Sequence, residues 1–295
     1  MINSLKYNKR NYIFYDIFEK DNSVIGIGPY YPDLVPKGLY GNIQCSIGNE
    51  TVNGTIIQDP HRHTLIVKFE FEENIYIRKR LLITFENRKH IFNIEKPKQK
   101  EEKEIVLGTM FKNCAKYLEN WIKYHKSIGI QHFYLYDNES NDTELLHEVC
   151  EKYKSIVTLT RWPFPYVRKP SGISGQTTAQ NQCIYKYGHN CSWIGLTDLD
   201  EYIFSKESSL INVLKANKEK DIGGFLMPCM WFGCSFHVEY ENDFLEKLVY
   251  RKQNAEGVGK GKGPKSFIKP ENVNVFAIHR IVSGKEQIQM DSNIL

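Results

Sequence analysis

The chain has 295 residues, 41% of them hydrophobic and 25% charged, a composition typical of globular proteins and long enough for two domains. Lysine and arginine (39) barely exceed aspartate and glutamate (35), and the net charge of +4 is not gathered into a basic stripe, which disfavours nucleic acid as a partner. No stretch approaches the ~18 consecutive apolar residues of a membrane span, and the amino-terminal residues lack the apolar core of a signal peptide.

The seven cysteines lack the paired spacing of a disulfide framework. Three of them, Cys150, Cys183 and Cys229, lie within apolar segments and are expected to be buried thiols. Together with the absence of a signal peptide or transmembrane segment, this favours a soluble, cytoplasmic protein.

Short strands separated by Gly, Pro and Asn are predicted for the first third of the chain. Their ranges are Tyr12–Phe18, Leu39–Ile47, Thr51–Gln58, Thr64–Phe71, Ile75–Arg80 and Lys89–Ile94. Because no helical period occurs there, residues 1–98 are predicted to form an all-β domain, either a sandwich or a barrel. His61 and His63 are interpreted as part of a turn rather than as metal ligands. Residues 95–104 carry eight charges in ten positions, which indicates a connector at the domain boundary.

Strands and helices alternate in the second domain, residues 99–295. The predicted strands are Ile105–Phe111, His132–Tyr136, Ile156–Arg161 and Trp193–Thr197. The predicted helices are Ala115–Ile128, closed by Gly129; a second capped by Asp142 or Thr143, with Leu145, Leu146, Val149, Cys150 and Tyr153 facing inward; and Gln176–Tyr187, closed by Gly188. This order implies a mostly parallel sheet covered by helices, an α/β fold.

Asp198 and Asp200 follow the last of these strands, two positions apart. Side chains alternate along a strand, so both carboxylates are expected on one face and Glu201 on the other. Neighbouring carboxylates repel each other, and a divalent cation between them would relieve this and could hold a diphosphate. Ligands also collect where the strands of such sheets end. The motif therefore indicates a metal site, with a solvated acidic turn as the alternative.

Further segments occur in a fixed order along the chain. They are Lys112-Asn113, Trp121 to His125, His132 to Asn138, Gln180 to Cys183, Trp193 to Tyr202, Trp231 to Gly233, Lys265 to Pro270, and His279. In this order they resemble glycosyltransferase family 92 over roughly residues 105–280. The resemblance implies a Rossmann-like GT-A fold with a mixed, mostly parallel sheet and flanking helices. It also implies an inverting enzyme that uses Mn²⁺ or Mg²⁺ and moves a sugar, typically galactose, from a UDP-sugar to a hydroxyl of a glycan or other acceptor.

The resemblance also implies roles for individual residues. Asp198 and Asp200 would hold the metal, and His279 would complete the site because imidazole is a common ligand beside carboxylates. The alternative for His279 is a histidine of the core whose ring is satisfied by hydrogen bonds. Asp198 would also face the bound donor, and Lys112 and Asn113 are further donor-binding candidates.

Seven other residues are candidates for further roles. Asp137 would bind the uracil or ribose, or else cap an Asx-turn. Lys265 ends a stretch rich in glycine and lysine that begins at Gly257, and it would close over the departing diphosphate, unless the stretch is merely flexible. Inversion needs a carboxylate base, for which the candidates are Glu239, Glu241 and Asp243. Trp231 and Phe232 would stack on a sugar ring or belong to the core.

Two other functions are compatible with the sequence. An apolar strand ending in Asp-x-Asp also occurs in haloacid-dehalogenase-like phosphatases, where Asp198 would be the nucleophile, but Tyr202 stands where Thr or Val is expected. A non-catalytic carbohydrate-binding protein on a transferase scaffold is the second alternative, because Cys114 and Asn120 replace acidic residues usual in the family.

Overall fold

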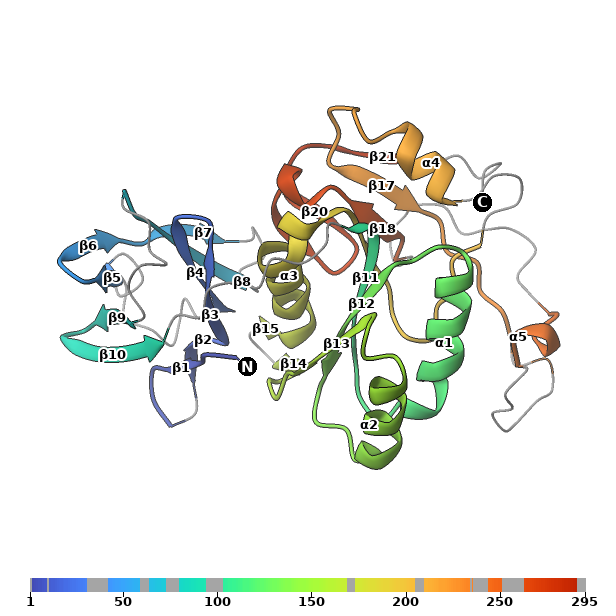
Figure 1. The fold of residues 1–295 in the computed structure, drawn as a ribbon, viewed down its shortest axis with the longest axis horizontal. Helices are drawn as coiled ribbons and strands as arrows, with labels where there is room; N and C mark the ends of the chain where they lie inside the picture. The colour runs from blue at the N-terminus through green and yellow to red at the C-terminus, as the bar shows by residue number, and fades with distance from the viewer. Residues whose placement is uncertain are drawn as a thin grey trace.

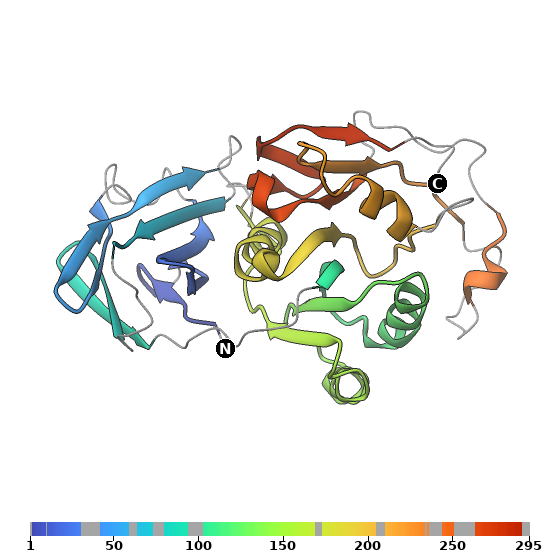
Figure 2. The ribbon, with the colours of Figure 1, turned by 45° about the horizontal axis from the view of Figure 1, so that its top comes forward.

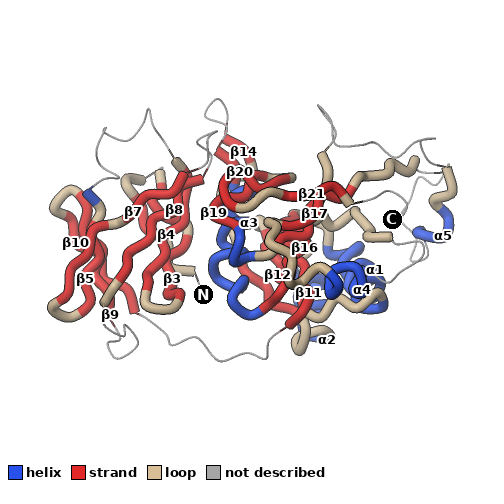
Figure 3. Tube along the Cα trace, turned by 90° about the horizontal axis from the view of Figure 1, so that it is seen from above, coloured by secondary structure: helices blue, strands red, loops and turns tan. Residues whose placement is uncertain are grey.

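The computed structural model describes residues 2–9, 11–30, 42–58, 64–72, 80–93, 103–168, 173–204, 210–233, 235, 244–250 and 263–290. The molecule is elongated, with the strands of the first third on one side and a mixed α/β body on the other (Figure 1). Helix α3 (Gly175–Tyr187) lies between the two, as the turned views also show (Figures 2 and 3).

Strands make up all the regular structure described before residue 94, apart from a single 3-10 position at Asn42. They are β1 (Leu5–Lys6), β2 (Tyr12–Phe14), β3 (Asp16–Lys20), β4 (Ser23–Pro29), β5 (Gln44–Ile47), β6 (Glu50–Asn53), β7 (Thr55–Gln58), β8 (Thr64–Glu70), β9 (Arg80–Phe85) and β10 (Arg88–Asn93). Within the described ranges they form the pair β1-β2 and two four-stranded antiparallel sheets of order β3-β4-β8-β7 and β10-β9-β5-β6. Alternate side chains of β8 and β9, such as Val67 and Ile83, meet in one core between these sheets.

Strand β4 (Ser23–Pro29) is not among the predicted strands, and it contains glycines and a proline, which are uncommon inside strands. The glycines are there because β2 passes close by. A Cβ at Gly26 would lie 2.7 Å from the Phe14 ring, and one at Gly28 would lie 2.0 Å from the carbonyl oxygen of Ile13.

The other predictions for this region hold only in part. The strand expected over Thr51–Gln58 is interrupted at Gly54, whose N–H donates to the carbonyl of Ile43 (2.9 Å). The strand expected over Ile75–Arg80 lies outside the described residues except for Arg80, which belongs to β9. His61 and His63 also lie outside it.

The central sheet has seven strands in the described residues, in the order β13-β12-β11-β16-β18-β17-β21. Their bounds are β11 (Lys103–Phe111), β12 (His132–Asp137), β13 (Val157–Arg161), β16 (Cys191–Leu196), β17 (Gly224–Met227), β18 (Lys265–Ile268) and β21 (Gln287–Gln289). The first four in this order run parallel, β18 is antiparallel to both neighbours, and β21 is parallel to β17. The prediction of a mostly parallel α/β sheet is confirmed. Two short pairs accompany it, β14 (Val167–Arg168) with β15 (Ile173–Ser174) and β19 (Val273–Ala277) with β20 (Arg280–Gly284).

Helices cover both faces of this sheet. Ile105 and Leu107 of β11 point to the face covered by α1 (Ala115–Ser127), α2 (Thr143–Lys152) and α4 (Leu210–Ala216). Val106 and Met110 point to the opposite face, where α3 packs together with residues of β3, β4 and β8. The remaining described elements are η3 (Gly188–Asn190), α5 (Phe244–Lys247) and η4 (Pro270–Asn272). Among the described residues, no helix has the length and apolar character needed to cross a membrane.

The first two helices of the body follow their sequence signals closely. Helix α1 is closed by Gly129, which has a φ of +98°. Asp142 stands at the N-cap position of α2, yet its carboxylate accepts the N–H of Ala115 (2.7 Å) and so caps α1 instead. Leu145 was predicted to face inward, but its side chain is 40% exposed. The residues of α2 that are buried are Leu146 and Val149.

The cysteines of the described residues are all free thiols. Cys183 is buried, and burial raises the pKa of its thiol to about 12. Cys150 and Cys229 are only partly buried, so the expectation of buried thiols holds for one of the three.

Candidate functional site

The four parallel strands of the sheet end at one edge, and this edge collects the predicted donor residues. Lys112 and Asn113 follow β11, Asp137 is the last residue of β12, and Asp198 lies two residues beyond β16. Strand β18 runs in the opposite direction, so its first residue, Lys265, lies at the same edge. Residues far apart in sequence are thus assembled where α/β sheets bind ligands.

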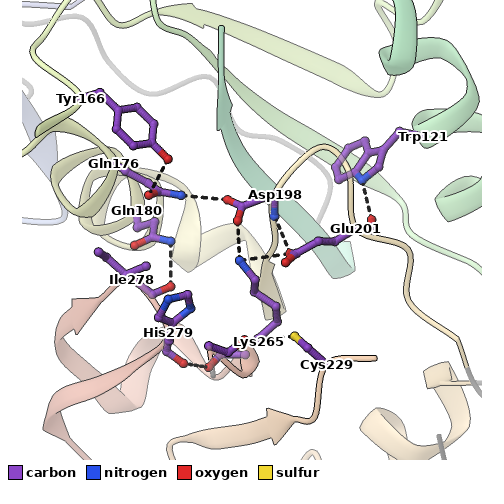
Figure 4. A network of polar contacts seen from close by, with 12 residues as sticks. Trp121, Tyr166, Gln176, Gln180, Asp198, Glu201, Cys229, Lys265, Ile278 and His279 are labelled. Atoms are coloured by element: carbon purple, nitrogen blue, oxygen red, sulfur yellow. Dashed lines mark hydrogen bonds and ion pairs between the residues drawn. The ribbon is translucent and has the colours of Figure 1, made fainter. Parts of the chain in front are cut away.

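Asp198 is the centre of a polar network at this edge (Figure 4). Its Oδ1 accepts a hydrogen bond from Nε2 of Gln176 (2.8 Å), the second residue of α3. Its Oδ2 accepts from Nζ of Lys265 (2.6 Å). Its backbone N–H donates to Oε2 of Glu201 (2.8 Å), which also pairs with Nζ of Lys265 (3.1 Å). Both carboxylate oxygens of Asp198 therefore have fixed partners.

Tyr166 extends this network on the side of α3. Its hydroxyl donates to Oε1 of Gln176 (3.0 Å), which leaves the amide nitrogen of Gln176 directed at Asp198. Tyr166 lies in the irregular segment between β13 and β14, and Gly175 donates its N–H to the carbonyls of Pro165 (2.9 Å) and Tyr166 (3.0 Å). The start of α3 and this segment consequently position Gln176 together.

The lysine of the network is buried and charged. Lys265 is only 6% exposed. Burial alone would lower its pKa, but the carboxylates of Glu201 and Asp198 outweigh this effect and raise the pKa above its ordinary value. For Glu201, burial raises the pKa and Lys265 opposes this shift. Lys265 was expected at the end of the glycine- and lysine-rich stretch, and it is instead the first residue of a buried strand.

The acidic segment is a turn rather than the end of a strand. Strand β16 ends at Leu196, and the N–H of Glu201 donates to the carbonyl of Asp198 (3.2 Å). Alternation of side chains applies only within a strand, so the expectation of one shared strand face for Asp198 and Asp200 is wrong. Glu201, expected on the opposite face, instead returns its carboxylate to Asp198 and Lys265, while Asp200 is exposed.

Helix α1 holds the residues that follow the acidic turn. Nε1 of Trp121 donates to the carbonyl of Glu201 (3.0 Å), and the hydroxyl of Tyr124 donates to that of Ile203 (2.7 Å). The N–H of Ile203 is directed at Nε2 of His125 (3.4 Å). The other ring nitrogen of His125, Nδ1, lies 2.8 Å from the carbonyl oxygen of Trp121. His125 is fully buried, and burial lowers its pKa to about 4. His125 is therefore a buried structural residue, and the turn is anchored by α1.

His279 lies beside this network, in the turn between β19 and β20. Its carbonyl accepts a hydrogen bond from Oγ of Ser266 (2.7 Å), and Figure 4 shows its ring near Lys265. A Cβ at Gly263 would lie 2.4 Å from Cε1 of the ring, so the chain before β18 packs directly on the imidazole. Burial lowers the pKa of His279, and Lys265 lowers it further.

The side chains present can be compared with what a divalent cation needs. Carboxylates and an imidazole are suitable donors for Mn²⁺ or Mg²⁺, and Asp198, Asp200 and His279 provide them. Among the described residues, however, no three His, Cys, Asp or Glu side chains are grouped closely enough to hold a metal. The donors thus fit in kind but, among the described residues, are not grouped to hold an ion, and the positive charge beside Oδ2 of Asp198 is the Lys265 ammonium group.

Two of the donor candidates, Asp137 at the end of β12 and Asn113 just after β11, contact the loop that follows β12. Oδ1 of Asp137 accepts the N–H of Ser140 (3.0 Å), which is the Asx-turn considered as the alternative. Asn113 has a φ of +57°, and its Oδ1 accepts the N–H of Asn141 (2.7 Å). Lys112 is exposed. Contact of these residues with a nucleotide stays a prediction.

The remaining candidates lie at or beyond the limits of the described residues. Glu239, Glu241 and Asp243 lie outside them, as do residues 257–262 of the glycine-rich stretch. Trp231 and Phe232 are 59% and 50% exposed, which rules out the alternative that they belong to the core.

Three residues of the network, Gln176, Glu201 and Tyr166, were not identified as site residues from sequence. The only available signal was the position of Gln176 at the start of a predicted helix and of Glu201 within the acidic motif.

Acidic side chains gathered where parallel strands end, with a helix beginning beside them, are typical of nucleotide-dependent α/β enzymes. Comparison with known proteins specifies the family. Residues 107–293 match the sequence profile of glycosyltransferase family 92, and the chain belongs to this family.

Individual relatives are plant proteins. A glycosyltransferase family 92 protein of Oryza sativa subsp. japonica is 32% identical over 134 residues, which cover 44% of this chain and 22% of the relative. One of Ricinus communis is 25% identical over 206 residues, covering 65% of this chain and 34% of the relative. The chain thus spans about a third or less of these relatives. Among solved structures, S. aureus TarS aligns with a TM-score of 0.35 and 12% identity, covering 57% of this chain and 47% of that chain.

Proposed function

We propose that this chain is a metal-dependent glycosyltransferase that moves a sugar, most simply galactose, from a UDP-sugar to a hydroxyl of a glycan or glycosylated acceptor, with inversion. Membership of glycosyltransferase family 92 supports the class of reaction. We assign a GT-A fold to residues 99–295 and an all-β domain to residues 1–98, in keeping with the mixed sheet of the former and the strands of the latter.

The observation that carries the proposal is the position of Asp198. Its carboxylate is held at the carboxyl edge of the parallel strands by Gln176 and Lys265, and its backbone is held by the turn to Glu201. A carboxylate placed rigidly at this edge is suited to a cation-bound diphosphate. Asp200, exposed and two residues later, is available to the same ligand.

We assign Mn²⁺ or Mg²⁺ to Asp198, Asp200 and His279. When bound, the ion would neutralise charge on the diphosphate as it leaves the sugar. Lys265 adds a fixed positive charge beside the same position and would stabilise the same developing charge. Asp137 would accept hydrogen bonds from the uridine, with Lys112 and Asn113 directly after the neighbouring strand, whose last residue, Phe111, pairs with Asp137.

Inversion in a single displacement needs one more group, a carboxylate that removes the proton from the acceptor hydroxyl. Glu239, Glu241 and Asp243 remain the candidates for this base. The exposed rings of Trp231 and Phe232 would offer an apolar surface on which an acceptor sugar can stack.

The test combines donor hydrolysis with nucleotide binding. With Mn²⁺ and UDP-galactose, the wild-type protein should slowly release UDP, and UDP binding measured by calorimetry should require the metal. The double variant Asp198→Asn/Asp200→Asn should lose metal-dependent UDP binding and at least ~100-fold of the hydrolysis rate.

The matched control is Asp221→Asn. Asp221 lies in the loop preceding β17, and its exposed carboxylate pairs with Lys285. This variant should bind UDP and Mn²⁺ like the wild type. Unchanged affinity for Mn²⁺ and UDP in the double variant would refute the proposed site. Release of inorganic phosphate would identify a phosphatase, and the absence of any product with retained glycan binding would identify a binding module.

A further inference from the structure

The polar side chains at positions 180–182 of α3 point in two directions. Nε2 of Gln182 donates to Oδ2 of Asp16 in β3 (2.8 Å), on the side of the amino-terminal strands. Gln180 and Asn181 instead bind the hairpin of β19 and β20, whose turn contains His279. Asn181 is completely buried, and a fully satisfied buried amide fixes the backbone that it binds. The contacts of Gln180 and Asn181 therefore concern the placement of this hairpin.

Asn181 binds both backbone groups of one residue in β19. Its Oδ1 accepts the N–H of Phe276 (2.9 Å), and its Nδ2 donates to the carbonyl of Phe276 (2.7 Å). The same Nδ2 also donates to the carbonyl of Thr177, one turn earlier in α3 (2.8 Å). Two residues beyond Phe276, the carbonyl of Ile278 accepts from Nε2 of Gln180 (3.1 Å; Figure 4). Side chains of α3 thus hold this edge of the hairpin as a neighbouring strand would.

The turn of the hairpin is strained at Ile278. Its φ is +45°, which is an outlier for a β-branched residue. The N–H of His279 donates to the carbonyl of Ala277 (2.5 Å) and closes a γ-turn with Ile278 at its centre. A γ-turn whose central residue has a positive φ is the rare and strained form. Such strain persists only where the surroundings impose it, and it is concentrated at functional sites.

The surroundings impose this turn from two sides. Gln180 holds the carbonyl of Ile278 from α3. Oγ of Ser266, in β18, donates to the carbonyl of His279 (2.7 Å). With the backbone fixed on both sides, the ring of His279 lies beside Lys265, as Figure 4 shows. The strained turn consequently determines where the imidazole is placed at the edge of the sheet.

We propose that Gln180 and Asn181 are positioning residues: by binding the backbone around the turn they keep it in its strained form, so that the imidazole of His279 stays beside Lys265 and faces the bound donor. The hold on His279 needs no ligand, because each of its contacts lies within the chain. The role toward the donor rests on the proposed function, which places a nucleotide sugar at this edge.

The first experiment measures the exposure of the His279 ring by acylation with diethyl pyrocarbonate, located by mass spectrometry. Gln180→Leu removes the amide that holds Ile278, so His279 should be acylated at least about threefold faster than in the wild type. The matched control is Gln131→Leu. Oε1 of Gln131 accepts the N–H of Ile105 (3.3 Å) near the start of β11, away from the hairpin, and this variant should leave the rate at His279 unchanged.

The second experiment releases the strain directly. Ile278→Gly lets the turn take other conformations, because glycine has no preference for the sign of φ. His279 should again be acylated faster, and donor hydrolysis at saturating UDP-galactose should fall at least about tenfold. The matched control is Glu86→Gly, since Glu86 has the same φ of +45° in the turn between β9 and β10. It should change neither rate, and both variants should melt within about 5 °C of the wild type.

A third measurement uses the wild type only and does not depend on the folding of a variant. Under the conditions of the hydrolysis assay, saturating UDP should slow the acylation of His279 at least about threefold, because a nucleotide at this edge covers the ring. Unchanged acylation with UDP bound would show that His279 does not face the donor, and would overturn that part of the proposal.

The outcomes separate this inference from the proposed function. Unchanged acylation of His279 in both Gln180→Leu and Ile278→Gly overturns the positioning role. Faster acylation with unchanged donor hydrolysis shows that the placement of His279 is structural, and overturns its role toward the donor. Faster acylation in the variants, with neither UDP binding nor hydrolysis in the wild type, refutes the proposed function and leaves the hold of α3 on His279 standing.

Discussion

Replacing Asp16 with alanine should weaken the attachment of the amino-terminal strands to the body of the protein. Asp16 is completely buried in β3. Its Oδ1 accepts the N–H groups of Asn3 (2.7 Å) and Ile17 (3.0 Å). Its Oδ2 accepts from Gln182 (2.8 Å) and Lys186 (2.9 Å), both on α3.

The magnitude follows from what the substitution leaves behind. Removing one partner of a buried ion pair costs about 3–5 kcal/mol, because the remaining charge loses its compensation. The side chain of Lys186 is 24% exposed and can regain some water, which favours the lower end of this range, ~3 kcal/mol. At about 2–4 °C per kcal/mol, the melting temperature should fall by roughly 6–12 °C.

The assay is urea denaturation followed by circular dichroism, with Asp16→Ala, Lys186→Met and the double variant. If the two side chains interact as the structure shows, the double variant should be less destabilised than the sum of the single variants by about 1–3 kcal/mol. A loss below ~1 kcal/mol in Asp16→Ala, or strict additivity, would refute the argument that this network joins the first third of the chain to α3.

Three further outcomes are expected. The folded-state pKa of His125, about 4, lies below the ~6.5 of the unfolded chain, so the unfolded state binds more protons between these values. The free energy of unfolding should have its full value above about pH 6.5 and fall by up to ~3 kcal/mol as the pH drops toward 4. Urea denaturation midpoints should show this dependence on pH in the wild type and not in His125→Phe. Gln176→Leu should reduce donor hydrolysis by about tenfold and Tyr166→Phe by less, because Tyr166 acts only through the Gln176 amide; equal rates for wild type and Gln176→Leu would contradict the network. A fragment of residues 99–295 should be insoluble or molten, because α3 would expose the apolar face that β3, β4 and β8 cover; a soluble fragment with a sharp melting transition would show that residues 99–295 fold without the amino-terminal strands.

The sequence by itself determined the elements whose signals are local. Helix α1 was predicted to within one residue, because Leu118, Trp121, Ile122 and His125 repeat with the helical period and Gly129 ends it. The alternation of strands and helices after residue 103 was sufficient to predict a mostly parallel sheet, and with it the edge at which Asp198 lies. The resemblance to glycosyltransferase family 92 depended on short segments in order, and it is confirmed by the match over residues 107–293.

The tertiary structure alone decided which side chains meet. Lys265 reaches Asp198 across 67 residues because β18 enters the sheet antiparallel to β16, a direction that no local pattern encodes. Gln176 reaches Asp198 because α3 begins at the edge where β16 ends. The glycines of β4 resembled strand breaks until the close passage of β2 explained them. The physical reason is the same in each case: periodicity and capping act within a few residues, whereas ion pairs and close backbone contacts depend on how whole elements pack.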